Sequence, residues 1–207
     1  MGFLKNLFKS SPKTKPVVYV VSGLPRSGTS MMMKMLEAGG IMPVTDEIRE
    51  ADPDNPKGYY EFERVKQMDK GDTAWLEKAP GKVVKVISAL LKHLPDDYDY
   101  KVIFMRRNMP EILASQRKML VRREEDANAM DDEKMAALFE KHLVQIEQWL
   151  ADQPNFDTLY VHYSDALADP EAQVKRLLTF LGDHLDGEAM GEVVDPDLYR
   201  NRTRKIS

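Results

Sequence analysis

Glycine, hydroxyl and basic side chains cluster in the segment Gly23-Leu24-Pro25-Arg26-Ser27-Gly28-Thr29-Ser30. Glycines let the main chain approach an anion closely, and consecutive backbone N–H groups in such a turn form a concave anion-binding surface. Thr29 and Ser30 add hydroxyl donors, and Arg26 adds a positive charge. These residue types predict a site for a phosphate or a similar anion.

The spacing of this loop is that of the nucleoside triphosphate P-loop, G-x-x-x-x-G-K-[ST], but Thr29 stands where the lysine belongs. The cation has moved to Arg26, inside the loop. Triphosphate chemistry also needs a carboxylate at a strand end to hold Mg²⁺, whereas the predicted strand 101–105 runs into Arg106-Arg107-Asn108. Two positive charges there repel a metal ion and attract a phosphate. We therefore expect an anion site that holds no metal.

An alternative is that the glycines serve only the backbone of a strand-to-helix turn. Against it, four residues suited to an anion all fall at expected strand ends: Arg26, Thr29, Ser30 and Arg107.

Strands and helices must alternate to position these residues. Strand patterns occur at 17–21, 83–87, 101–105 and 158–162, and helical periodicity occurs at 31–36, 112–120, 135–149 and 174–181. Because the strands are apolar on both faces, we expect a three-layer α/β fold with a central parallel sheet and helices on each side. Ligands bind such sheets beyond the carboxyl ends of the strands, where the glycine loop begins. We expect one domain at 17–199, between basic tails at 1–16 and 200–207.

Composition excludes several other functions. Of the 207 residues, 43% are hydrophobic and 31% charged, as in a soluble globular protein, and the net charge of −4 gives no general attraction to nucleic acid. The chain has no cysteine, and its four histidines are scattered, so no metal site is expected. The N-terminal apolar residues are too few for an export signal, and no segment is suited to span a membrane, so a cytoplasmic location is expected.

With these motifs, the sequence from residue 17 to about 182 resembles the sulfotransferases, whose α/β core is similar to that of P-loop nucleoside triphosphate hydrolases. The loop at 25–30 resembles their 5′-phosphosulfate loop, in which a Lys or Arg occupies the place of Arg26. The segment 107–115 is similar to their 3′-phosphate motif, in which an Arg and a Ser eight residues later, here Arg107 and Ser115, bind that phosphate. The resemblance implies 3′-phosphoadenosine 5′-phosphosulfate (PAPS) as co-substrate, bound by Arg26, Ser27, Gly28, Thr29, Ser30, Arg107 and Ser115.

Two further residues are assigned to the nucleotide by the resemblance. Tyr163 begins a segment similar to one whose tyrosine lies beside the adenine, and packing at a strand end is the alternative. Asp169-Pro170 in the same segment predicts a helix start. Arg202 belongs to a basic C-terminal stretch of the kind that closes the 3′-phosphate site in family members, and an unstructured tail is the alternative.

The segment from Asn55 to Glu61 is similar to one in bacterial-type members of the family. Animal cytosolic members have a Lys and a catalytic His after the strand that matches 83–87; Lys85 is present here, but Ile87 replaces the histidine. Arg26 and Lys85 suit neutralisation of the leaving group, and Glu61 is the first candidate for the base. The alternatives are that Glu61 is a solvated charge, or that the base is Asp46, Glu47 or Glu77.

The resemblance implies a sulfotransferase that moves a sulfuryl group from PAPS to a hydroxyl or amine of a small-molecule or glycan acceptor, by metal-independent in-line transfer. Two alternatives stay open: a non-catalytic protein that binds a 3′-phosphoadenosine nucleotide, and an ATP-dependent small-molecule kinase. We expect the acceptor pocket to form from 45–71 and the region near Arg122. The sequence indicates neither the acceptor nor the oligomeric state.

Overall fold

A central sheet, with four parallel strands in the part of the chain that the structure describes, organises the molecule. The computed structural model describes residues 14–46, 60–122, 124, 126 and 131–194. Its sheet contains β1 (Val17–Gly23), β2 (Val83–Ile87), β3 (Asp99–Arg106) and β4 (Phe156–His162), in the order β2-β1-β3-β4. The predicted strands and their parallel arrangement are therefore confirmed.

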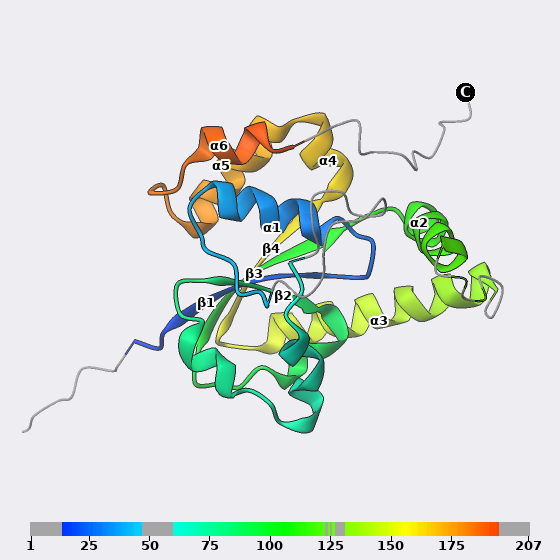
Figure 1. The fold of residues 1–207 in the computed structure, drawn as a ribbon, viewed down its shortest axis with the longest axis horizontal. Coiled ribbons are helices and arrows are strands. Elements are labelled where there is room, and N and C mark those ends of the chain that lie inside the picture. The colour runs from blue at the N-terminus through cyan, green and yellow to red at the C-terminus, as the bar shows by residue number, and fades with distance from the viewer. Residues whose placement is uncertain (1–13, 47–59, 123, 125, 127–130, 195–207) are drawn as a thin grey trace, which may run out of the picture.

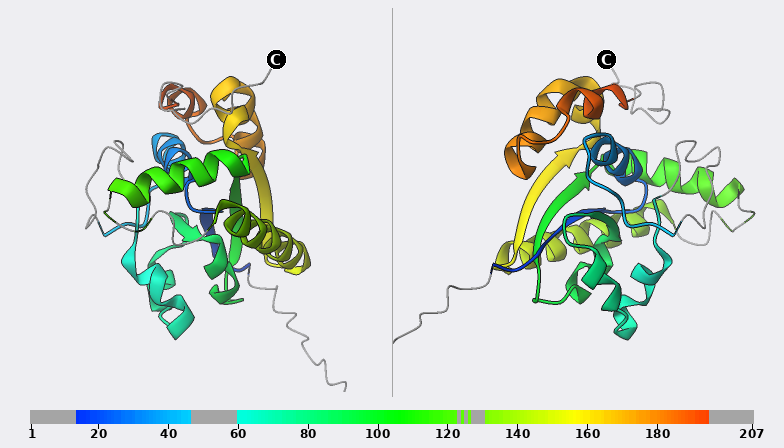
Figure 2. Two further views of the ribbon diagram at one scale, coloured as in Figure 1. Left: turned by 90° about the vertical axis from the view of Figure 1, so that its right-hand side faces the viewer. Right: turned by 60° about the vertical axis from the view of Figure 1, so that its left-hand side comes forward.

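Helices cover both faces of this sheet, as predicted (Figure 1). One face carries α1 (Thr29–Ala38), α4 (Tyr163–Ala168), α5 (Pro170–Leu181) and α6 (Gly187–Glu192). The other carries α3 (Asp132–Asp152) and three short 3₁₀ helices, η1 (Glu63–Lys70), η2 (Ala74–Lys78) and η3 (Ser88–His93). Helix α2 (Met109–Arg122) follows β3, and the two rotated views show it projecting beyond the sheet (Figure 2).

Side chains on neighbouring positions of a strand enter different cores. Val83 is fully buried in the core beneath α1, whereas Val84 and Val86 are buried in the core that contains Trp75. This follows from the two-residue period of a strand, and it explains why the strands are apolar on both faces.

The predicted helix start at Asp169-Pro170 is confirmed. Asp169 caps α5, since its carboxylate accepts a hydrogen bond from the backbone N–H of Ala172 at 3.0 Å, and Pro170 is the first helical residue, as predicted. No helix within the described part of the chain is both long enough and apolar enough to cross a bilayer.

Candidate active site

Between β1 and β3, the direction in which successive strands are added to the sheet reverses. From β1 the chain continues to β2 on one side, and from β3 it continues to β4 on the other side. The carboxyl ends of β1 and β3 are adjacent, because Gly23 pairs with Met105. In parallel α/β sheets this switch point is the usual place for a ligand.

The loop after β1 has a backbone that suits close approach of an anion. Arg26 has a φ of 68° and Gly28 a φ of 100°, both in the left-handed region, and α1 begins at Thr29. A Cβ on Gly28 would lie 2.4 Å from a ring carbon of Tyr163, so this position needs glycine for space as well as for φ. Ser27 is only 1% exposed, and its hydroxyl has no hydrogen-bond partner in the part of the chain that the structure describes. Its side chain therefore lies inside the loop.

The two predicted phosphate-binding groups lie in one cluster. The Nε of Arg26 donates a hydrogen bond to Ser115 Oγ at 2.9 Å, and Nη1 of Arg107 donates to the carbonyl oxygen of Arg26 at 3.1 Å. Ser115 is about two turns into α2, so the chain has reversed between Arg107 and Ser115. The residues come from three elements and meet at the switch point.

Glu111 is a member of this cluster that the sequence interpretation missed. Its carboxylate accepts a hydrogen bond from Arg107 Nε at 3.0 Å, and the two side chains are only 3% and 8% exposed. The spacing of four residues, with Arg107 just before α2 and Glu111 in its first turn, was the available signal. Glu111 fixes the guanidinium of Arg107 in a buried, charge-paired geometry.

Tyr163 packs beneath the glycine loop. It is the first residue of α4, is 7% exposed, and its ring lies under Gly28 with the guanidinium carbon of Arg107 4.5 Å from its centroid. These contacts agree with the packing role that was the alternative for this residue. The adenine contact stays a prediction.

Lys85 and Glu61 form a second group beside the loop. The Nζ of Lys85 donates to Ser30 Oγ at 3.3 Å and lies 4.0 Å from Glu61 Oε1, and Lys66 lies 3.7 Å from the other oxygen of Glu61. A cation and a carboxylate are thus held next to a hydroxyl at the start of α1. This arrangement can neutralise a developing negative charge and accept a proton.

A model of the sulfotransferase family matches residues 58–186 of the sequence. The chain belongs to the sulfotransferase family. No curated protein matches its sequence. The matched range includes Glu61, Lys85, Arg107 and Ser115, and the glycine loop lies before it.

Solved sulfotransferase structures share the fold of this sulfotransferase. The mouse sulfotransferase SULT7A1, complexed with PAP, matches with a TM-score of 0.56 and 16% identity, over 92% of this chain and 67% of that one. The sulfotransferase domain of the Synechococcus PCC 7002 olefin synthase gives a TM-score of 0.53 at 16% identity, over 95% and 92% of the two chains. A sulfotransferase domain from the curacin biosynthetic pathway gives 0.52 at 13% identity, over 92% and 93%. At such identities, these matches show a common fold.

The backbone around Glu61 in this sulfotransferase is held by side chains on both sides. Thr45 Oγ1 donates to the carbonyl oxygen of Glu61 at 3.1 Å, and Asp46 accepts from the backbone N–H of Glu63 at 2.7 Å. Tyr60, with a left-handed φ of 50°, donates from its hydroxyl to Glu37. Burial, together with the Glu37 carboxylate, raises the pKa of Tyr60 above its usual range. These contacts hold the backbone from which the Glu61 side chain extends.

Of the three alternative bases predicted from the sequence, the structure describes Asp46 and Glu77. Asp46, an alternative base, accepts a hydrogen bond from the backbone, and Glu77 lies on η2. Ile87, which stands where animal cytosolic members of the family have the catalytic histidine, is 42% exposed at the end of β2. Arg202, Glu47 and most of the segment from Asn55 to Glu61 lie outside the described residues.

His142 is a titratable residue that the sequence interpretation did not single out. Its Nε2 lies 2.9 Å from Ser88 Oγ, and this hydrogen bond joins α3 to the first residue of η3. Burial, and secondarily the charge of Lys92, lowers the pKa of His142 below its ordinary value.

Proposed function

We propose that this sulfotransferase moves a sulfuryl group from PAPS to a hydroxyl or amine of a small-molecule or glycan acceptor, without a metal ion. One observation carries the donor assignment: Arg107 bonds to the carbonyl of Arg26, and Arg26 bonds to Ser115. The residues expected at the two ends of one nucleotide therefore lie within reach of each other. The PAP in the mouse structure of similar fold supports the same choice of nucleotide.

The donor would lie across the switch point. Its 5′-phosphosulfate is assigned to the loop 26–30, which leads into the N-terminus of α1 at Thr29, because a helix N-terminus can bind an anion through its backbone N–H groups. Its 3′-phosphate is assigned to Arg107 and Ser115, and its adenine to Tyr163. Ser115 accepts its hydrogen bond from Arg26 and keeps a hydroxyl proton that it can donate to a phosphate oxygen. Arg202 is proposed to close the 3′-phosphate end.

The transfer forms one bond and breaks one. The acceptor oxygen or nitrogen attacks sulfur, the bond between sulfur and the 5′-phosphate oxygen breaks, and the electron pair stays on that oxygen. Arg26 and Lys85 neutralise the negative charge that develops there. Glu61, 4.0 Å from Lys85, accepts the proton that the acceptor loses. We assign these steps to a single domain at 17–199 that acts in the cytoplasm.

Thermal shift with three nucleotides tests the donor assignment. Adenosine 3′,5′-bisphosphate should raise the melting temperature, adenosine 5′-monophosphate should raise it less, and ATP with Mg²⁺ should have no larger effect than the monophosphate. Stronger stabilisation by ATP with Mg²⁺ would favour a kinase. Turnover of sulfur-labelled PAPS with a panel of phenols, alcohols and amines then separates an enzyme from a protein that only binds the nucleotide.

A further inference from the structure

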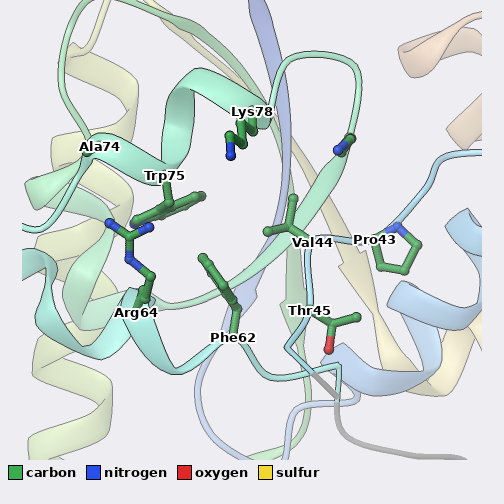
Figure 3. Close-up of a pocket in the computed structure, with 9 residues that line it drawn as sticks. Pro43, Val44, Thr45, Phe62, Arg64, Ala74, Trp75 and Lys78 are labelled. Carbon is green, nitrogen blue, oxygen red and sulfur yellow. The ribbon is translucent and has the colours of Figure 1, made fainter. Parts of the chain in front are cut away.

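A pocket of about 370 Å³ lies beside the edge strand β2. It is bounded by the segment 43–45, which runs along the start of β2, and by η1 and η2 (Figure 3). Phe62 and Trp75 form an aromatic wall, with ring centroids 5.4 Å apart and planes at 79°. Trp75 is 5% exposed, and its indole N–H donates to the carbonyl oxygen of Asp72 at 3.0 Å. Trp75 therefore belongs mainly to the core, and the partly exposed ring of Phe62 in front of it is the aromatic surface that the pocket offers a ligand.

The pocket lies on the opposite face of the sheet from the proposed transfer site. Phe62 and Trp75 belong with Val84 to the core that contains η1 and η2. Lys85 projects to the other face, where it bonds to Ser30 of α1. The alternation of side chains along β2 therefore puts the strand between the pocket and the transfer site.

Positive charge gathers around this aromatic wall. Arg64 is paired with Asp72, its Nε at 2.8 Å from the carboxylate, so its charge is neutralised. Lys78 and Lys82 also line the pocket, and both are exposed. Within the described residues, the structure gives neither of these two ammonium groups a hydrogen bond or an ion pair. Two cations that form no ion pair with any described residue, beside an apolar wall, favour an anion that carries an apolar body.

We propose that this pocket is a second ligand site, which takes a small organic anion with a flat aromatic body, such as an aryl carboxylate or aryl sulfonate. The ring of Phe62, which packs against Trp75, contacts the flat body, and Lys78 and Lys82 bind the anionic group. The site is separate from the proposed donor site and is measured by binding alone. Its failure would leave the sulfotransfer proposal unaffected, and the reverse also holds.

Calorimetric titration of the full chain with 2-naphthalenesulfonate tests the site. We expect saturable binding of one equivalent, and about the same affinity when the protein is first saturated with adenosine 3′,5′-bisphosphate. Neutral 2-naphthol and inorganic sulfate should each bind more weakly, because each lacks one half of the recognised chemistry. The double substitution Lys78→Gln with Lys82→Gln should weaken binding about tenfold, from two partly exposed charge contacts.

Two further variants complete the test. Ala74→Leu enlarges an exposed side chain at the pocket and should abolish binding without unfolding the protein. Lys175→Gln with Lys134→Gln removes the same charge from exposed positions on α5 and α3, and should leave binding unchanged. The proposal is overturned if the probe is displaced by the bisphosphate, if 2-naphthol binds as well as the sulfonate, or if no saturable binding occurs.

Discussion

The guanidinium of Arg107 donates a hydrogen bond to the backbone carbonyl of Arg26 at 3.1 Å, and so joins the end of β3 to the loop after β1. The same guanidinium is held by Glu111 and lies over the ring of Tyr163. Arg107 therefore supports the shape of the loop in addition to its proposed contact with phosphate. These two roles can be separated by experiment.

Arg107→Ala should abolish stabilisation by adenosine 3′,5′-bisphosphate. It should also lower the free energy of unfolding by about 3–5 kcal/mol, because it leaves the buried Glu111 carboxylate unpaired. Arg107→Met combined with Glu111→Leu replaces the pair by apolar side chains and should restore most of the stability but none of the nucleotide binding. Urea denaturation and thermal shift measure the two effects. If the double variant still binds the nucleotide, Arg107 is not part of the donor site.

Gly28→Ala should distort the loop, because the new Cβ meets the ring of Tyr163 and because φ at this position is 100°. We expect a loss of about 1–3 kcal/mol in stability and a large loss of affinity for the bisphosphate. Gly191→Ala is the matched control, since nothing lies within 4 Å of a Cβ at that position in α6. Equal effects of the two substitutions on binding would show that the loop tolerates a side chain at 28.

Glu61→Gln keeps the size of the side chain and removes its ability to accept a proton as a carboxylate. The turnover number should fall by about 10²–10⁴, with the affinity for the bisphosphate unchanged. Glu63→Gln is the control, because its side chain is 45% exposed and pairs with Lys66. Single-turnover transfer of labelled sulfuryl measures the effect. If both variants transfer at the wild-type rate, the base is another group.

Lys85→Ala removes the cation that contacts Ser30 and lies close to Glu61. By analogy with the loss of an oxyanion donor, the turnover number should fall by about 10²–10³. Lys85→Arg keeps the charge and should recover part of the rate, whereas Lys175→Ala on α5 should have no effect. Steady-state rates with PAPS and a fixed acceptor are the measurement. If the substitution raises only the KM for the acceptor and leaves the turnover number unchanged, Lys85 does not act at the reacting centre.

His142 should make stability depend on pH. Because burial lowers its pKa below the ordinary 6.5, the unfolded chain binds a proton more readily than the folded chain. The contribution of His142 to the free energy of unfolding is present above pH 6.5, and it is lost as the pH falls from 6.5 to the lower pKa of the folded state. Urea midpoints at about pH 7.5 and about pH 5.5 should differ less in His142→Gln than in the wild type. The same change at the exposed His162 should leave the difference as it was.

The fold could be predicted because each strand and helix has its own periodicity. Apolar runs at 17–21 and 101–105 gave two strands whose ends carry Arg26 and Arg107. The carboxyl ends of parallel strands meet at one edge, so these residues were expected close together. The adjacency of β1 and β3 depends on packing between distant segments, and local pattern does not encode it.

Contacts that depend on packing were harder to predict. Glu111 looks in the sequence like an ordinary charge in the first turn of a helix. Its spacing from Arg107 permits an ion pair, and its burial beside Arg107 in the structure shows its role. Tyr163 was predicted at a strand end, but no sequence pattern indicates that its ring lies under Gly28. The acceptor pocket, expected from 45–71 and the region near Arg122, stays a prediction. The pocket beside β2 lies on the other face of the sheet from the proposed transfer site and is lined in part by Lys78 and Lys82, which have no distinctive pattern in the sequence.

Glu61 and Phe62 are consecutive residues, and they belong to different sides of the sheet. Glu61 reaches Lys85, while the ring of Phe62 contacts Trp75. The same short stretch of backbone therefore sets where the carboxylate and the ring lie. One peptide bond thus joins the two faces, so that a change of backbone conformation there would move the carboxylate and the ring together.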